Sequence, residues 1–231
     1  MDIENIQDEN GLLFCFVFSV ESKRFSICLD YRRCIEQAKT IQSEEKSLFC
    51  QNFYFVFYAE LELNLNRYFS ESSRECWSLL FVDYDFMPPV PLNSSLPIQM
   101  FYWNQNVLMI QHNAKVKYCC RDCSYEWTSA RGRAIFQAEI PEENKHNVLF
   151  AYLFHQQCQK CFRDTEPCWY VDEATRVMKN ISRILIEKFY SDRDFPFDDD
   201  FQTDLHQRES DMRHHHNRNL CSACQHRTCY D

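Results

Sequence analysis

Cysteine pairs separated by two residues recur in the second half of the chain. There are three of them: Cys120 with Cys123, Cys158 with Cys161, and Cys221 with Cys224. Two thiolates at this spacing can point at one cation, and two pairs from distant segments complete the tetrahedral shell of a structural zinc ion. One pair alone is a weak signal, because it also occurs as a redox motif or by chance. Three pairs in one chain predict metal binding.

Two further residues near the third pair have side chains that suit zinc. His216 precedes Cys221 by five residues, and Cys229 follows Cys224 by five. They bring the candidate ligands to eight, which is enough for two closed sites: Cys120, Cys123, Cys158, Cys161, His216, Cys221, Cys224 and Cys229. The spacing does not assign ligands to sites, so one or two zinc ions remain open. Cys119 and Cys168 are spare candidates.

The pattern predicts structural metal sites and no enzyme. A catalytic zinc keeps one position open beside a general base. The sequence contains neither HExxH nor the H-x-E and P-C-x-x-C combination of zinc deaminases. With 2 glycines in the whole chain, a glycine-rich phosphate loop is excluded, and no Gly-x-Ser-x-Gly motif occurs.

Composition favours metal over disulfide bonds for the 14 cysteines. The first ten residues, MDIENIQDEN, are acidic where a secretory signal carries positive charge, and the apolar run that follows, 12–20, is too short to span a bilayer. The last residues, RTCYD, supply no hydrophobic tail. We therefore expect a cytoplasmic protein, in whose reducing surroundings paired cysteines favour metal.

Charge is spread unevenly along the chain. The net charge is -9, but residues 114–190 hold 12 basic and 10 acidic side chains, which gives +2, whereas 191–213 hold 3 and 8, which gives -5. Phosphate contacts usually demand a basic surface. The chain as a whole therefore does not resemble a nucleic-acid-binding protein.

Hydrophobic periodicity predicts an α+β fold of antiparallel strands with a long C-terminal helix, its second half stapled by zinc. The expected elements are a hairpin over 11–31, a helix over 32–57, strands over 76–86, 115–120, 133–140 and 148–156, a hairpin over 98–111 with its tip at 104–106, and a helix over 172–190. The segment FYFVFYAELEL could extend the first helix or form a strand. We expect an N-terminal region over 1–110, of unassigned role, and a zinc-binding domain over 111–231 with a flexible acidic loop at 191–213.

The helix over 172–190 has the clearest pattern. Its apolar side chains form one stripe, made of Ala174, Val177, Met178, Ile181, Leu185 and Phe189. We interpret the stripe as the face that packs on the sheet. Asp172 is positioned to cap the N-terminus of this helix.

The segments around the three pairs resemble the 3CxxC-type zinc finger of the receptor-transporting protein family. YCCRDCSYEWTSARGRAIF resembles its first pair and Trp-x-Ser-Ala signature, here Trp127, Ser129 and Ala130. LFHQQCQKC resembles the second pair, ATRVMKNISRILIEKFY the helix, and HNRNLCSACQHRTC the terminal His, Cys-x-x-Cys and Cys. The resemblance covers about 115–231. Zygote arrest proteins, which share the terminal motif, are more distant relatives.

The resemblance implies a zinc-binding chaperone or adaptor that helps seven-helix membrane receptors reach the cell surface. It also implies a location in the cytoplasm or at the periphery of the endoplasmic reticulum or plasma membrane. Many members of the family carry a C-terminal hydrophobic anchor, which this sequence does not show, and the first half of the chain is unlike them.

Binding of RNA by the finger is the alternative hypothesis. The +2 balance of 114–190 permits it, with cationic side chains near the pairs and aromatic rings available for stacking on bases. The residues concerned are Arg131, Arg133, Lys160 and Arg163, and the rings of Tyr125 and Trp127. The acidic remainder of the chain opposes this reading.

Overall fold

The structure is a computed structural model. It describes residues 2–7, 13–19, 24–27, 53–69, 76–82, 98–104, 107–139, 147–193, 195, 205 and 216–229. Most of the helix expected over 32–57 and most of the acidic loop expected over 191–213 lie outside these residues. Near the N-terminus, β1 (Asp2–Gln7), β2 (Leu13–Ser19) and β3 (Arg24–Ile27) form an antiparallel meander, in which β2 and β3 make the expected hairpin.

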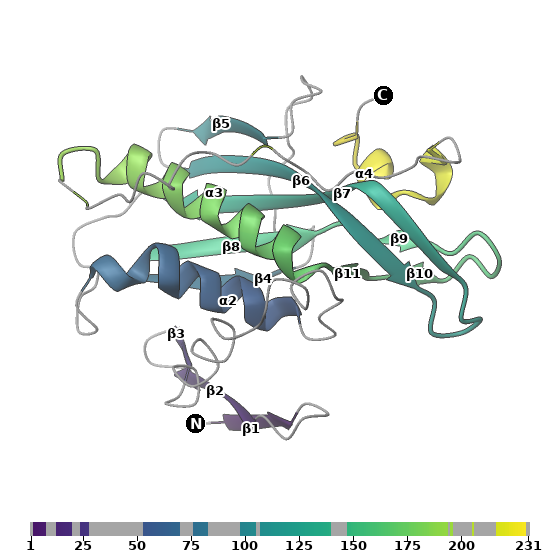
Figure 1. The fold of residues 1–231 in the computed structure, drawn as a ribbon, viewed down its shortest axis with the longest axis horizontal. Coiled ribbons are helices and arrows are strands. Elements are labelled where there is room, and N and C mark those ends of the chain that lie inside the picture. The colour runs from purple at the N-terminus through teal and green to yellow at the C-terminus, as the bar shows by residue number, and fades with distance from the viewer. Residues whose placement is uncertain are drawn as a thin grey trace.

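A six-stranded sheet organises the rest of the described chain (Figure 1). Its strands are β4 (Trp77–Phe81), β5 (Ile98–Asn104), β6 (Val107–Cys119), β7 (Glu126–Glu139), β8 (Asn147–Leu153) and β11 (Pro167–Trp169). The order is β11-β6-β7-β8-β4. The strand β5 also pairs with β6, on the same side as β11: β5 pairs with the first half of β6 and β11 with the second half. All pairings are antiparallel except that of β4 with β8, which is parallel.

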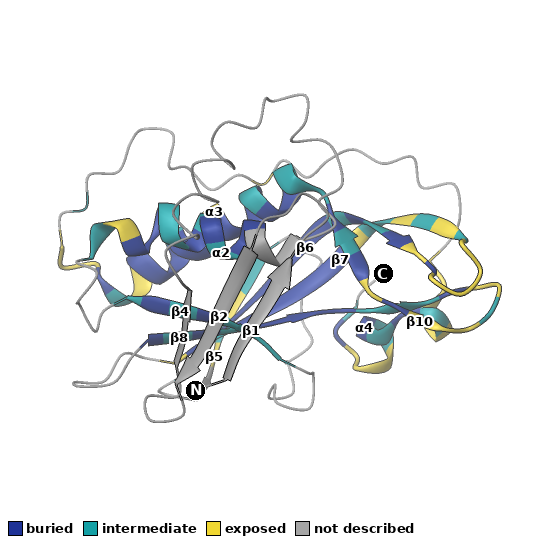
Figure 2. Ribbon diagram, turned by 90° about the horizontal axis from the view of Figure 1, so that it is seen from below, coloured by how far each residue is buried: buried dark blue, intermediate teal, exposed yellow. Residues whose placement is uncertain are grey.

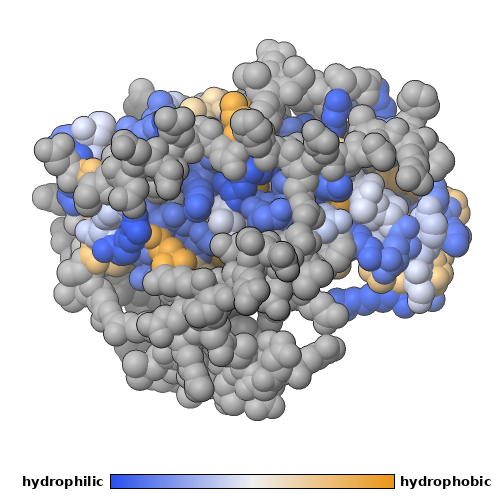
Figure 3. Space-filling view, in the orientation of Figure 1, coloured by the Kyte–Doolittle hydropathy of each residue, from blue (hydrophilic) through white to orange (hydrophobic). Residues whose placement is uncertain are grey.

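Two helices cover one face of this sheet. They are α2 (Phe53–Asn64), which resolves the open choice for FYFVFYAELEL in favour of a helix, and α3 (Val171–Phe189). The apolar stripe of α3 is buried against the sheet, as expected, while hydrophilic residues cover its outer side (Figure 3). Phe57 of α2 packs edge-on against Trp169 of β11, with ring centroids 5.2 Å apart. The main core lies between these helices and the sheet.

The α+β class is confirmed, but the long C-terminal helix is wrong as a description. Among the described residues of the second half, the one long helix is α3, which begins at Val171 and precedes the third cysteine pair. Beyond it, the described residues contain a single turn, η4 (Arg218–Leu220), and the short helix α4 (Ser222–Gln225). Asp172 lies inside the first turn of α3, where its charge suits the helix dipole. Tyr170 takes the N-cap position, and its side chain does not make the capping hydrogen bond.

The sheet also bears on the expected division at residue 110. The strand β6 runs across this position, and β4 and α2, which precede it, share a sheet and a core with elements that follow it. Asn66, in the single turn η2 (Asn66–Tyr68), accepts a hydrogen bond from the backbone N–H of Trp77 at 2.7 Å. The division into two regions with separate roles stays a prediction.

A buried polar network joins α3 to β6 and β7. His112 of β6 bonds the carbonyl of Asn113 through Nδ1 at 2.8 Å and contacts Nδ2 of Asn180 through Nε2 at 3.0 Å. The ring can satisfy both contacts when it is neutral, with its proton on Nδ1. Arg176 donates to the Asn113 carbonyl at 3.0 Å and to Glu173 at 2.7 Å. The network fixes the register of the helix against the sheet.

The β6–β7 hairpin depends on one glycine. The register shifts between Ala114 and Val116, and Gly132 lies opposite this irregularity. A Cβ on Gly132 would lie 2.4 Å from Cγ2 of Val116, which is far inside van der Waals contact. The two strands can therefore approach this closely only because Gly132 has no side chain.

Among the described residues, no helix combines the length and the apolar character needed to cross a membrane.

Candidate metal centres

The structure brings all eight candidate ligands together as two groups of four. In each group the four ligand atoms lie within 4.8 Å of one another. We call Cys120, Cys123, Cys158 and Cys161 the first centre, and His216, Cys221, Cys224 and Cys229 the second centre. All of these cysteines are free thiols rather than disulfides. The grouping gives the division of ligands that the spacing left open.

The first centre is built from two equivalent turns. In the first turn, the N–H of Ser124 donates to the carbonyl of Cys120 at 2.8 Å, and the N–H of Cys120 donates to Tyr125 at 2.9 Å. In the second turn, Phe162 donates to Cys158 at 2.8 Å, and Cys158 donates to Arg163 at 2.9 Å. The two turns therefore have the same hydrogen-bonding pattern, and each presents its two thiols on one side.

The residue after each pair takes the same unusual backbone conformation. Ser124 has φ 55° and Phe162 has φ 60°, in the left-handed region that disfavours residues with a side chain. The first turn follows β6, and the second lies between β9 (Gln156–Gln157) and β10 (Asp164–Thr165). Exposed residues gather at this end of the sheet (Figure 2).

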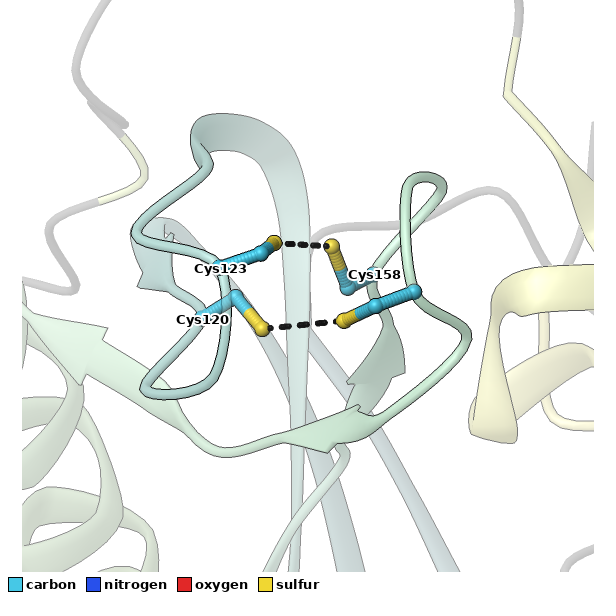
Figure 4. Close-up of side chains that lie close together, drawn as sticks. Cys120, Cys123 and Cys158 are labelled. Carbon is cyan, nitrogen blue, oxygen red and sulfur yellow. Dashed lines mark hydrogen bonds between the residues drawn. The ribbon is translucent and has the colours of Figure 1, made fainter.

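Sulfur positions in the first centre fit a zinc ion. Cys120 lies 3.4 Å from Cys161 and Cys123 lies 3.5 Å from Cys158, sulfur to sulfur, so that the two turns face each other (Figure 4). A tetrahedral zinc with bonds of about 2.3 Å places its sulfurs roughly 3.8 Å apart. Closing that small difference needs only side-chain adjustment, and four thiolates are the donors that zinc prefers.

Local hydrogen bonds favour the thiolate form of Cys120 and Cys158 in the first centre, whereas the pKa values of their partners Cys123 and Cys161 are raised. The backbone N–H of Cys123 makes the largest contribution, and with the Cys161 thiol it lowers the pKa of Cys120 to about 6. The N–H of Lys160 also points at the Cys158 sulfur, 3.4 Å away. Because zinc binds the deprotonated sulfur, such donors prepare the turns for metal.

An aromatic ladder connects the two turns of the first centre. Trp127 stacks on Tyr118 with centroids 5.1 Å apart and on Tyr125 at 5.7 Å, and its Nε1 donates to Gln156 at 2.8 Å. The Tyr125 ring then carries the Lys160 ammonium 4.4 Å from its centroid, and its hydroxyl accepts a hydrogen bond from the Gln159 amide. Trp127 thus braces the first turn against the second.

The second centre is local in sequence. His216, Cys221, Cys224 and Cys229 fall within one segment, and the third pair brackets the start of α4 rather than a turn of the kind found in the first centre. Nε2 of His216 lies 3.0 Å from the Cys224 sulfur and 3.7 Å from the Cys229 sulfur. Three thiolates and one imidazole nitrogen form a common structural zinc set.

Short contacts attach the second centre to the body. Cys221 forms an isolated antiparallel bridge with Gln156, and Ser222 donates to the carbonyl of His155 through its N–H at 3.2 Å and its hydroxyl at 2.7 Å. The segment lies on the face of the sheet opposite α2 and α3 (Figures 1 and 2). There the buried apolar residues that pack with Cys221 are Met109, Ile135, Tyr152, Phe154 and Ala223.

Electrostatics couple the thiols of the second centre. Hydrogen bonding to Cys221, together with contributions from His216 and the charge of Arg133, lowers the pKa of Cys229 to about 4. The pKa of Cys221 moves far upward, first through the same bond and then through burial. The pKa values of the two thiols therefore move in opposite directions, and a bound dication would favour the thiolate form of both.

Comparison with known families agrees with this geometry. Residues 113–227 match the family of 3CxxC zinc ribbons, described as a zinc-binding domain.

This part of the chain is a 3CxxC-type zinc-binding domain.

Its two groups of ligand atoms accommodate one or two zinc ions, as the sequence predicts. No curated protein and no solved structure matches the chain. The 3CxxC domain contains all eight candidate ligands except Cys229, which lies two residues beyond the match.

Four residues singled out from the sequence have other places in the 3CxxC domain. Cys119 and Cys168, the spare ligand candidates, belong to neither group. Arg133, assigned to RNA in the alternative hypothesis, is buried, and Trp127 uses its ring within the ladder. The sequence carried a signal for Arg133, because alternation along β7 from the buried Ile135 places both side chains on the same face.

Proposed function

We propose that the chain is a non-enzymatic zinc scaffold that acts as an adaptor or chaperone for seven-helix membrane receptors during their transport. The observation that carries the proposal is the closure of both centres. Each supplies four protein ligands, so that a tetrahedral zinc would have no position left for a substrate or a water molecule. Such an ion supports the fold rather than performing chemistry.

The resemblance to receptor-transporting proteins supplies the receptor part of the proposal. It rests on the order and spacing of the three pairs, the Trp127 signature and the final cysteine. The family match supports the zinc-binding part. A zinc-stapled module with an exposed end would suit an adaptor, because rigid turns hold contact residues in place without ordering cost at binding.

Phe162 is the residue on which a protein contact would centre. Its side chain is 66% exposed at the tip of the second turn, where the equivalent residue of the first turn is Ser124. A left-handed backbone that carries a bulky exposed ring costs about 1 kcal/mol or more, and such strain clusters at functional positions. Large aromatic side chains are also the commonest anchors of protein interfaces.

The charges beside Phe162 favour a protein partner over a polyanion. Arg163 pairs with Asp122, Nε to Oδ2 at 3.0 Å, and Lys160 lies over the Tyr125 ring. A zinc ion held by four thiolates would add net negative charge beneath these cations. The end of the domain would therefore present balanced charge around an aromatic tip.

Co-precipitation of a seven-helix chemosensory receptor with the full chain tests the proposal. We expect Cys158→Ala to abolish capture and Phe162→Ser, which copies the first turn, to reduce it about tenfold while both zinc ions are retained. Cys119→Ser, which changes an exposed thiol outside both centres, is the matched control. Equal capture by all three variants, or unchanged receptor delivery to the cell surface in cells that lack the protein, would contradict the proposal.

An RNA-retention assay on the same preparations separates the alternative function. Binding through phosphate contacts would weaken steeply as salt rises, because counterion release sets the slope. Strong, salt-sensitive retention that Lys160→Ala and Arg131→Ala remove, without capture of a receptor, would replace the adaptor proposal by an RNA-binding one.

A further inference from the structure

Arg133 is a buried cation beside the second centre. Its side chain is 3% exposed on β7, and its Nε donates to Oδ1 of Asn113 on the neighbouring strand at 3.1 Å. Residues of one face alternate along a strand, so Arg133 shares its face with Ile135, which packs with Cys221. The guanidinium thus lies on the side of the sheet where the second centre is attached, not on the helix-covered side.

Backbone contacts place Arg133 next to the anchoring strand end. The N–H of Phe154 donates to the Arg133 carbonyl at 3.0 Å, and Phe154 belongs to the same apolar cluster as Cys221. The next residue, His155, provides the carbonyl that holds Ser222. Arg133 and the second centre are therefore neighbours at the C-terminal end of β8.

A closed second centre would need a counter-charge. Three thiolates and a neutral imidazole around a dication leave one net negative charge. Cys221 of this centre is buried and packs on apolar side chains, where unbalanced charge is costly. The first centre differs, because Cys123 is exposed to water and exposed cations such as Arg121 lie close by in sequence.

We propose that Arg133 is a positioning residue for the second metal centre, holding a fixed positive charge beside its thiolates and so strengthening zinc binding there but not at the first centre. This inference rests on the zinc scaffold proposed above.

The polar network holds the Arg133 side chain in place. Asn113, which accepts from Arg133 through its side chain, accepts from Arg176 through its carbonyl, and Arg176 pairs with Glu173 at 2.7 Å. The backbone N–H of Lys115 also donates to Glu173, at 3.0 Å. Because outer hydrogen bonds orient the groups nearest a metal, this chain of contacts would transmit order from α3 to the second centre.

Stepwise removal of zinc from the full-length protein tests the inference. Wild-type protein, Arg133→Met and Arg133→Lys are dialysed against increasing chelator, and retained zinc per mole is measured. We expect Arg133→Met to lose one of two zinc ions at a chelator concentration about tenfold lower than wild type, the usual effect of changing a residue that supports the metal ligands. Arg133→Lys should behave nearly as wild type. His216→Ala marks the behaviour of protein that holds metal at the first centre alone.

A purely structural role for Arg133 gives different results. Release of both ions from Arg133→Met at the wild-type chelator concentrations, or an equal weakening of both centres, overturns the inference. If Arg133→Met does not fold, Asn113→Ala, which removes the acceptor but keeps the charge, takes its place. It should weaken the second ion selectively, and equal weakening of both ions again overturns the inference. Wild-type protein that holds fewer than two zinc ions would instead contradict the proposed scaffold.

Discussion

Cysteine thiols supply most of the ligands at both metal centres, but the two centres differ in how far apart in sequence their ligands lie. The first joins turns that are distant in sequence, with Cys120 facing Cys161 across 41 positions. The second takes all its ligands from one short segment, from His216 to Cys229. A distant pair of turns closes a large loop of the domain, whereas a local set only shapes a segment and attaches it. The same cation would therefore have unequal importance for the fold.

The two centres also differ in burial: the first, on which more of the fold should depend, is the more exposed. The first lies at the exposed end of the sheet and is braced by rings, from Tyr118 through Trp127 to Tyr125. The second lies against the apolar side of the sheet that the helices do not cover, with Cys221 bridged to Gln156. The comparison teaches that sequence distance between ligands, rather than burial of the site, decides how much of the fold depends on the metal.

Cys158→Ala should have the largest effect. A structural zinc can contribute on the order of 10 kcal/mol to folding, and this change takes away the ligand that starts the second turn of the first centre. We expect loss of one zinc ion per chain, loss of hydrogen-exchange protection around 118–127 and 156–165, and a large fall in thermal stability. Metal analysis with hydrogen exchange measures all three. Cys119→Ser is the control, and the same damage in that variant would undermine the assignment.

His216→Ala should have a smaller and more local effect. We expect one zinc ion to be lost, the segment 216–229 to lose protection, and the unfolding free energy of the body to fall by about 2 kcal/mol, the scale of one buried apolar side chain. His226→Ala changes an exposed histidine of the same segment outside the group and should retain both ions. A collapse as severe as that of Cys158→Ala would break the contrast between the centres.

Acidification should destabilise the fold through the buried His112, independently of the two metal centres. Burial, followed by the charge of Arg176, lowers the pKa of His112 from 6.5 to about 3. Between these values the unfolded chain binds the extra proton, so stability is full above pH 6.5 and falls as pH drops toward 3. From pH 6.5 to 5 the loss is about 2 kcal/mol. Denaturant unfolding at each pH measures it, with metal content checked.

His112→Gln should flatten this dependence. A glutamine can keep polar contacts to the network but does not titrate, so the difference between the two proteins isolates the histidine. Parallel curves for wild type and variant would mean that loss of metal from the centres, rather than protonation of the body, causes the acid sensitivity.

Glycine after each cysteine pair of the first centre should have the smallest effect, and a stabilising one. Ser124 and Phe162 both occupy left-handed backbone, so Ser124→Gly and Phe162→Gly should each raise stability by at most about 1 kcal/mol, the strain relieved less the entropy of glycine. Arg227 has φ 55° near the second centre, and Arg227→Gly should affect that segment alone. Thermal melts would test the comparison, and unequal gains at Ser124 and Phe162 would argue against equivalent turns.

The ligands and the main elements could be predicted because their signals are local. Spacing selected every cysteine of both groups, and the stripe from Ala174 to Phe189 placed α3 within one residue at each end. The hairpin of β5 and β6 was predicted from alternation around a polar tip, which lies between Asn104 and Val107.

Features that depend on tertiary contact could not be predicted. Asp172 is a residue type that favours the N-cap position, but α3 begins one residue before it, at Val171. The parallel pairing of β4 with β8 has no local signal, because it joins segments some 70 residues apart. Alternation places Arg133 on the face of Ile135, but its charge favours a surface position, and the neighbouring strand with Asn113 is what accounts for its burial. The assignment of the eight ligands to two centres could be made only from the positions of the turns in the folded structure.

The parallel edge strand has a practical consequence for anyone who isolates the zinc-binding module. A fragment cut at the boundaries of the family match, 113–227, would lack β4, β5, α2 and the start of β6. It would leave the hydrogen-bonding edge of β8 open and uncover the side of α3 on which Thr175 bonds Glu60. Open edges beside apolar surface recruit other chains. Such a fragment would also lack Cys229 of the second centre, and it would aggregate even with zinc at the first centre. A fragment that begins before Phe53 and includes Cys229 would stay soluble.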